Sequence, residues 1–106
     1  MQVSKLLPLC LLAACGAQPA PQFFGAERHD LALDGIAFAV FLKDDYAEVI
    51  RLGGYLPLSE RDRVPALMKE AAEQVAGCPV AGPARGFYAS PSLPGDTGEA
   101  RFRMAC

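Results

Sequence analysis

The chain has few of the residues from which common active sites are built. It contains one histidine, His29, and no Gly-x-Ser-x-Gly motif, so a Ser-His-Asp site or a histidine-rich metal site lacks its parts. Its formal net charge is only −2 and its basic residues are scattered, which argues against a nucleic-acid partner. We therefore expect no catalytic, cofactor or metal site, and a protein that is not an enzyme.

Pairs of neighbouring charged residues do not change this expectation. Asp44 and Asp45 are adjacent, but a calcium loop needs oxygen ligands spaced around a central glycine, so a turn is the better interpretation. The basic residues that lie closest together are expected on solvated faces: Arg61 with Arg63, and Arg101 with Arg103.

Near the N-terminus, the apolar run is too short to span a membrane. Residues 6–12 form a stretch of seven apolar or helix-breaking residues, which as a helix would rise about 10 Å against a hydrocarbon core of roughly 30 Å. Lys5 precedes this stretch and small residues follow it. That order is typical of a signal peptide that is removed.

The residues Leu12-Ala13-Ala14-Cys15 resemble the bacterial lipobox. The resemblance implies that residues 1–14 are a lipoprotein signal peptide and that Cys15 receives a lipid, which holds the protein to a membrane. It implies a bacterial cell-envelope protein that faces the periplasm, and Gly16 in place of Asp favours the outer over the inner membrane. An ordinary leader cut after Ala17, or a buried N-terminal helix, remains an alternative.

Cysteine usage fits an exported chain. Of the four cysteines, Cys10 would leave with the leader and Cys15 would carry lipid, so Cys78 and Cys106 remain and are predicted to form a disulfide. Two free thiols, or a metal pair, are the alternatives, although a metal would need further ligands.

Residues 15–24 are interpreted as the lipid-bearing cysteine and a short tether, and residues 25–106 as a single globular domain. The tether contains two prolines and no charge, and it ends in Phe23 and Phe24. These two rings either pack on the domain or dip into the membrane interface, and packing is the favoured interpretation.

Three strands are predicted at the start of the domain: residues 27–33, 36–43 and 46–52. Asp34-Gly35 between apolar runs is a strong hairpin signal, because a type I′ turn needs positive φ at both central positions. Asp44-Asp45 is the next predicted turn. The middle strand is apolar on both faces, so we expect it to be covered on both sides.

A helix follows, with an apolar stripe at Val64, Leu67, Met68, Ala71 and Val75. We predict Asp62 as its N-cap and Gly77 as its C-terminal stop. Residues 85–89 are predicted as a short strand, 90–98 as a loop and 99–106 as a final strand. The resulting order β-β-β-α-(β)-β indicates an α+β fold, in which one helix packs across a small antiparallel sheet.

The globular part also resembles small uncharacterised exported proteins of alphaproteobacteria. The matching features are Asp34-Gly35 before Phe38, Tyr46-Ala47-Glu48 before Arg51-Leu52, and Gly77-Cys78-Pro79-Val80 after the helix. This resemblance implies no activity.

Two functions fit the sequence. The first is a non-enzymatic envelope lipoprotein with a structural role or a protein partner in the envelope. The alternative is a periplasmic module that binds a small ligand or acts as an inhibitor. A pocket lined by Tyr46, Tyr55 or Tyr88 would favour the alternative.

Overall fold

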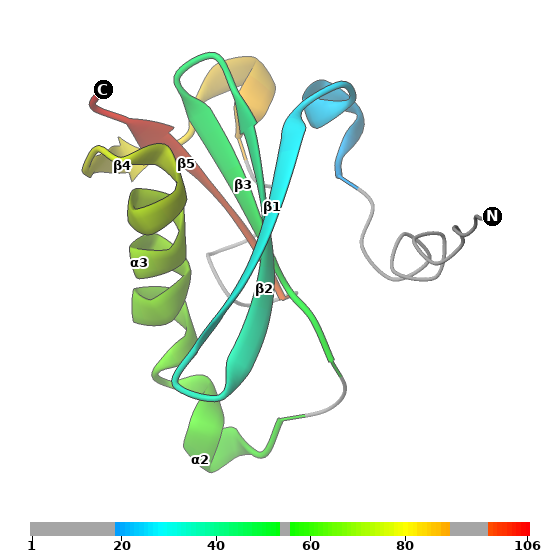
Figure 1. The fold of residues 1–106 in the computed structure, drawn as a ribbon, viewed down its shortest axis with the longest axis vertical. Coiled ribbons are helices and arrows are strands. Elements are labelled where there is room, and N and C mark those ends of the chain that lie inside the picture. The colour runs from blue at the N-terminus through cyan, green and yellow to red at the C-terminus, as the bar shows by residue number, and fades with distance from the viewer. Residues whose placement is uncertain (1–18, 54–55, 90–97) are drawn as a thin grey trace, which may run out of the picture.

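The computed structural model describes residues 19–53, 56–89 and 98–106. Within these ranges five strands form one open antiparallel sheet in the order β1-β2-β3-β5-β4, with a helix packed across it (Figure 1). The predicted α+β fold is therefore confirmed. The elements are η2 (Pro21–Phe23), β1 (Glu27–Leu33), β2 (Ile36–Lys43), β3 (Tyr46–Arg51), α2 (Leu58–Arg61), α3 (Val64–Ala76), β4 (Val80–Pro83), η3 (Gly86–Tyr88) and β5 (Glu99–Met104).

The first three strands form the predicted meander. Asp34 and Gly35 have φ values of 54° and 80°, as a type I′ turn requires, and Leu33 pairs with Ile36 across it. At the second turn Asp44 also has a positive φ, 54°, and Lys43 pairs with Tyr46. Aspartate tolerates this conformation better than most residues, which explains why both turns begin with it.

The main core lies between α3 and one face of the sheet. The predicted apolar stripe of α3 supplies Met68 and Ala71, which are fully buried against Phe38 and Val49. The helix ends at Gly77, whose φ of 76° lets its N–H reach the carbonyl of Glu73 at 2.9 Å. The predicted helix stop is confirmed.

The start of this helix differs from the prediction. Asp62 does not cap α3, because it ends the short helix α2 and has αR backbone angles, whereas a capping residue needs extended ones. Arg63 occupies the N-cap position without a side-chain cap. Its guanidinium instead contacts Glu60 at 2.8 Å and Asp34 at 3.0 Å.

The position of the fourth strand also corrects the sequence prediction. Residues 85–89 form no strand, since Gly86 adopts a φ of 62° and begins the 3₁₀ turn η3. The strand lies earlier, at Val80–Pro83, where Val80 pairs with Met104. Glu73 of α3 helps to fix its start, because its carboxylate accepts the Val80 N–H at 2.8 Å.

Candidate functional site

Two short segments cover the sheet face opposite α3. We call residues 20–26 the N-terminal hook and residues 84–89 the C-terminal hook. Phe23 of the first is fully buried on Ala39 and Phe41 of β2. Tyr88 of the second contacts the Phe23 ring edge-on, with ring centres 5.4 Å apart. β2 is thus covered on both faces, as its sequence predicted.

The N-terminal hook changes the interpretation of residues 15–24. From Ala20 to Phe24 the chain is not an extended tether, because residues 21–23 form a 3₁₀ turn that packs on the sheet. Residues 15–18 lie outside the described ranges. The prediction for the two phenylalanines is confirmed for Phe23 alone, since Phe24 is 59% exposed.

Beneath the hooks lies a buried charged cluster that we call the Glu48–Arg101 cluster. The Glu48 side chain is 1% exposed and that of Arg101 is 9% exposed. Arg101 Nε donates to Glu48 Oε2 at 3.2 Å and also to a carboxylate oxygen of Glu99. These three side chains form the only buried network of ion pairs in the described part of the chain.

This cluster fastens both hooks to the sheet. Glu48 Oε1 accepts the backbone N–H of Ala20 at 2.9 Å, and Arg101 Nη1 donates to the carbonyl of Ala89 at 2.7 Å. The acid therefore holds one hook and the base holds the other. Because Arg101 is charged, its hydrogen bonds are stronger than those between neutral groups.

Sheet register brings the cluster together. Phe41, Glu48 and Arg101 are cross-strand neighbours on β2, β3 and β5, so their side chains stand in one row on the same face. The sequence analysis missed Glu48, and its expectation that Arg101 lies on a solvated face was wrong. A charged residue in an alternating strand normally marks the solvent-exposed face. Here the two hooks cover that face and exclude water from it.

Burial raises the pKa of Glu48 from 4.5 to about 7. The hydrogen bond to Glu99 and its charge act in the same direction, while the Ala20 N–H and the Arg101 charge partly oppose them. Below this pKa, Glu48 and Glu99 can share one proton, which leaves one negative charge to balance Arg101. The cluster is then neutral in its buried setting.

A shallow cleft of about 520 Å³ opens beside the cluster. It is lined by Pro21, Gln22, Phe87, Ala89 and Arg101. Neither tyrosine of the described residues lines it, since Tyr46 and Tyr88 instead stack on each other with ring centres 4.1 Å apart. Tyr55, the third tyrosine of the predicted pocket, lies outside the described residues.

The arrangement is suited to holding structure more than to chemistry. Arg101 Nε is shared between two carboxylates and Nη1 donates to a backbone carbonyl, so these contacts of the guanidinium are all made within the fold. Glu48 lies under both hooks, where a substrate in the cleft would not reach it.

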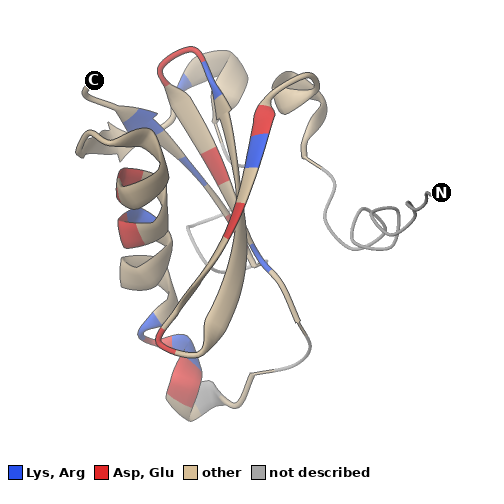
Figure 2. Ribbon diagram, viewed as in Figure 1, with Lys and Arg blue, Asp and Glu red and all other residues tan. Residues whose placement is uncertain are grey.

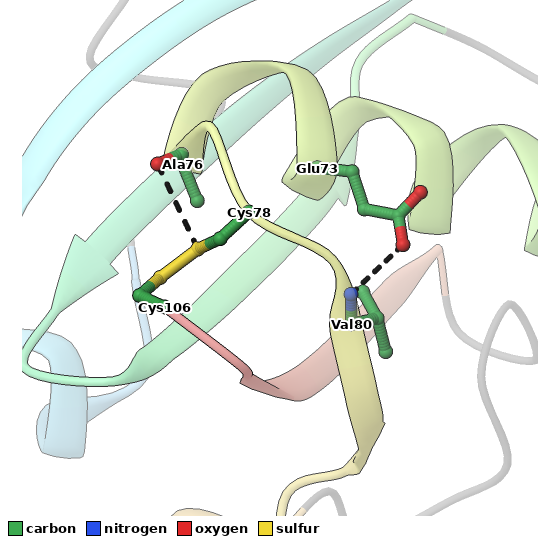
Figure 3. Close-up of a disulfide and its surroundings, with 5 residues drawn as sticks. All are labelled: Glu73, Ala76, Cys78, Val80 and Cys106. Atoms are coloured by element: carbon green, nitrogen blue, oxygen red, sulfur yellow. Dashed lines mark hydrogen bonds between the residues drawn. A yellow bond between two sulfur atoms is a disulfide. The ribbon is translucent and has the colours of Figure 1, made fainter.

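The other predicted site residues are placed as follows. Cys78 and Cys106 form the predicted disulfide, with Cα atoms 5.0 Å apart, and join the exit of α3 to the end of β5 (Figure 3). Cys15 and the leader lie outside the described ranges. His29 is at the surface, where its Nε2 lies 3.0 Å from Glu27.

Searches for a metal site and for a membrane span were limited to the described residues. These contain no group of three His, Cys, Asp or Glu side chains that could hold a metal ion. Their helices are also too short or too polar to cross a bilayer.

Comparison with known proteins gives no match: no family model, no curated protein and no solved structure is similar to this chain. The functional argument therefore depends on the residues themselves.

Proposed function

We propose that this protein is a small cell-envelope lipoprotein, held to a membrane by a lipid on Cys15, with a non-enzymatic protein-interaction or structural role. The disulfide between Cys78 and Cys106 is the observation that carries the proposal. Such bonds persist in oxidising compartments, of which the bacterial periplasm is one. The bond also uses the two cysteines that remain if Cys10 is removed and Cys15 is modified.

A binding role is favoured over catalysis by what the buried charges do. Among the described residues, the acid with a strongly raised pKa is Glu48, which is engaged with backbone and side-chain partners of the fold itself. A raised pKa at a cleft can mark a catalytic acid, but structural ion-pair networks perturb pKa values as well. Burial of Glu48 and the neighbouring Glu99 carboxylate account for this raised pKa without a substrate.

The test is the intact mass of protein extracted from membranes, measured with and without reduction. We expect a chain that starts at Cys15, carries the mass of a lipid, and gains two hydrogens on reduction. The matched control is Cys15→Ser, which should carry no lipid and leave the membrane fraction. A full-length, unmodified chain in the wild type would contradict the proposal.

A partner is sought by cross-linking in intact cells before purification. The Cys15→Ser protein serves as the control, since it keeps the folded domain and loses the lipid anchor. Recovery of one envelope protein with the wild type alone would support the interaction role. Recovery of none, together with an unchanged envelope on deletion, would contradict it.

A further inference from the structure

Two exposed aromatic rings lie on the neighbouring hooks. Phe24 is 59% exposed and Phe87 is 72% exposed, whereas the rings next to them in sequence, Phe23 and Tyr88, pack inward. The hooks are joined directly, because Gln22 Nε2 donates to the carbonyl of Phe87 at 3.0 Å. Both lie at the end of the sheet opposite α2, in blue and amber in Figure 1.

The rings are held in place by the fold. The Glu48–Arg101 cluster fixes Ala20 and Ala89, one on each hook. The Lys43 ammonium lies within 3.4 Å of the Gln22 carbonyl and 3.2 Å of the Phe24 carbonyl, and so braces the backbone beside the first ring. A fold that fixes two large apolar side chains in the open favours an apolar partner at that place.

The length of the chain before the hook suggests what that partner is. Five peptide steps separate Cys15 from Ala20, and a fully extended chain covers at most about 18 Å in that length. The Ala20 N–H is held by Glu48, so the reach is counted from a fixed point on the domain. A lipid on Cys15 would keep the hooks close to the bilayer surface.

We propose that Phe24, Phe87 and Lys43 form a membrane-facing surface, which we call the hook surface, and that its partner is the interface of a phospholipid bilayer. The proposal rests on the lipid anchor at Cys15. The two rings enter the headgroup region, where aromatic side chains are favoured. The Lys43 ammonium gives two of its three donors to the Gln22 and Phe24 carbonyls and turns the third to a lipid phosphate.

Charges of both signs surround the hook surface. Asp44 and Asp45 form the exposed turn directly after Lys43, which is red at the top of Figure 2. Glu27 at the start of β1 adds a third acid to this end, while Arg28 beside it and Arg85 of the C-terminal hook add bases. These charges largely offset one another, so contact should depend on the rings more than on salt.

The experiment uses tryptophan as a reporter, because the chain has none of its own. Three single variants are compared: Phe24→Trp, Phe87→Trp and, as a control on the exposed side of α3, Ala66→Trp. In one arm the membrane-extracted protein is reconstituted in phosphatidylcholine vesicles that contain brominated lipid. In the other, residues 15–106 are coupled through the Cys15 thiol to a maleimide phospholipid in the same vesicles.

We expect the reporters at positions 24 and 87 to shift to the blue, to be quenched by brominated lipid and to lose quenching by aqueous iodide. The Ala66→Trp protein should keep its aqueous behaviour. If the coupled chain gives this pattern while extracted protein carries no lipid mass, the hook surface is supported and the lipid anchor at Cys15 is contradicted.

Two outcomes would overturn the hook surface. The first is a lipid-bearing protein whose reporters at 24 and 87 stay open to iodide, which would leave the anchor intact. The second is shielding of these reporters only after envelope proteins are added, which would assign the rings to a protein partner.

Discussion

The two faces of the sheet are covered in different ways. On one face a thirteen-residue helix, α3, packs a dry core of aliphatic and aromatic side chains, and the disulfide joins the helix exit to β5. On the other face two hooks of a few residues each are fastened through buried charges, with Phe23 as the main apolar contact. A long amphipathic helix buries enough apolar area to need no polar fastening. Short hooks bury too little apolar area for this, so they depend on hydrogen bonds that the Glu48–Arg101 cluster provides.

Of the changes considered, replacement of the buried Arg101 should lower the free energy of unfolding most. Arg101→Met removes the partner of Glu48 and leaves the Ala89 carbonyl without its donor, so the free energy of unfolding should fall by about 3–5 kcal/mol at neutral pH. Urea denaturation measures it. The matched control is Arg103→Met on the same strand and face, which should change stability by about 0.5 kcal/mol or less.

The double variant Glu48→Gln with Arg101→Met sharpens the result. It removes both charges, so it should recover part of the stability that Arg101→Met loses. Equal losses for the two arginine variants would show that Arg101 is held no more tightly than a surface residue.

pH should act on the hook-covered face through Glu48. Its pKa in the folded protein, about 7, lies above its ordinary 4.5, so the folded state binds this proton more tightly than the unfolded state. The resulting stabilisation is complete below about pH 4.5 and is lost as the pH rises through 7, a change of about 3 kcal/mol. The measurement is the wild type minus Glu48→Gln, by denaturation at a series of pH values. A difference that does not vary with pH would contradict the raised pKa.

The smallest effect is expected at the start of α3. Asp62→Ala should change the free energy of unfolding by about 0.5 kcal/mol or less, because Asp62 is not the helix cap. Removal of a true N-cap typically costs about 1 kcal/mol. Asp34→Ala is the contrast: it places alanine at a φ of 54° and removes the contact with Arg63, so we expect a loss of about 1–2 kcal/mol by thermal denaturation.

The helix-covered face could be predicted from the sequence in most of its parts. The i, i+3, i+4 spacing predicted α3, and the Asp-Gly pair predicted the first hairpin. An apolar run between two turns predicted β2, and alternation predicted β5. The start of α3 could not be predicted, because α2 directly before it imposes helical angles on Asp62. The predicted strand at residues 85–89 was wrong because Gly86 has a positive φ and begins a 3₁₀ turn there.

The sequence by itself determined the local features of this protein: the turns, the helix stripe and the pair of cysteines in its folded part. These depend on residues close together in the chain or on simple counting. Only the tertiary structure decided that Glu48 and Arg101, 53 residues apart, are buried together beneath the hooks. Strand alternation tells which side chains share a face, and it does not tell whether another segment covers that face and removes its water.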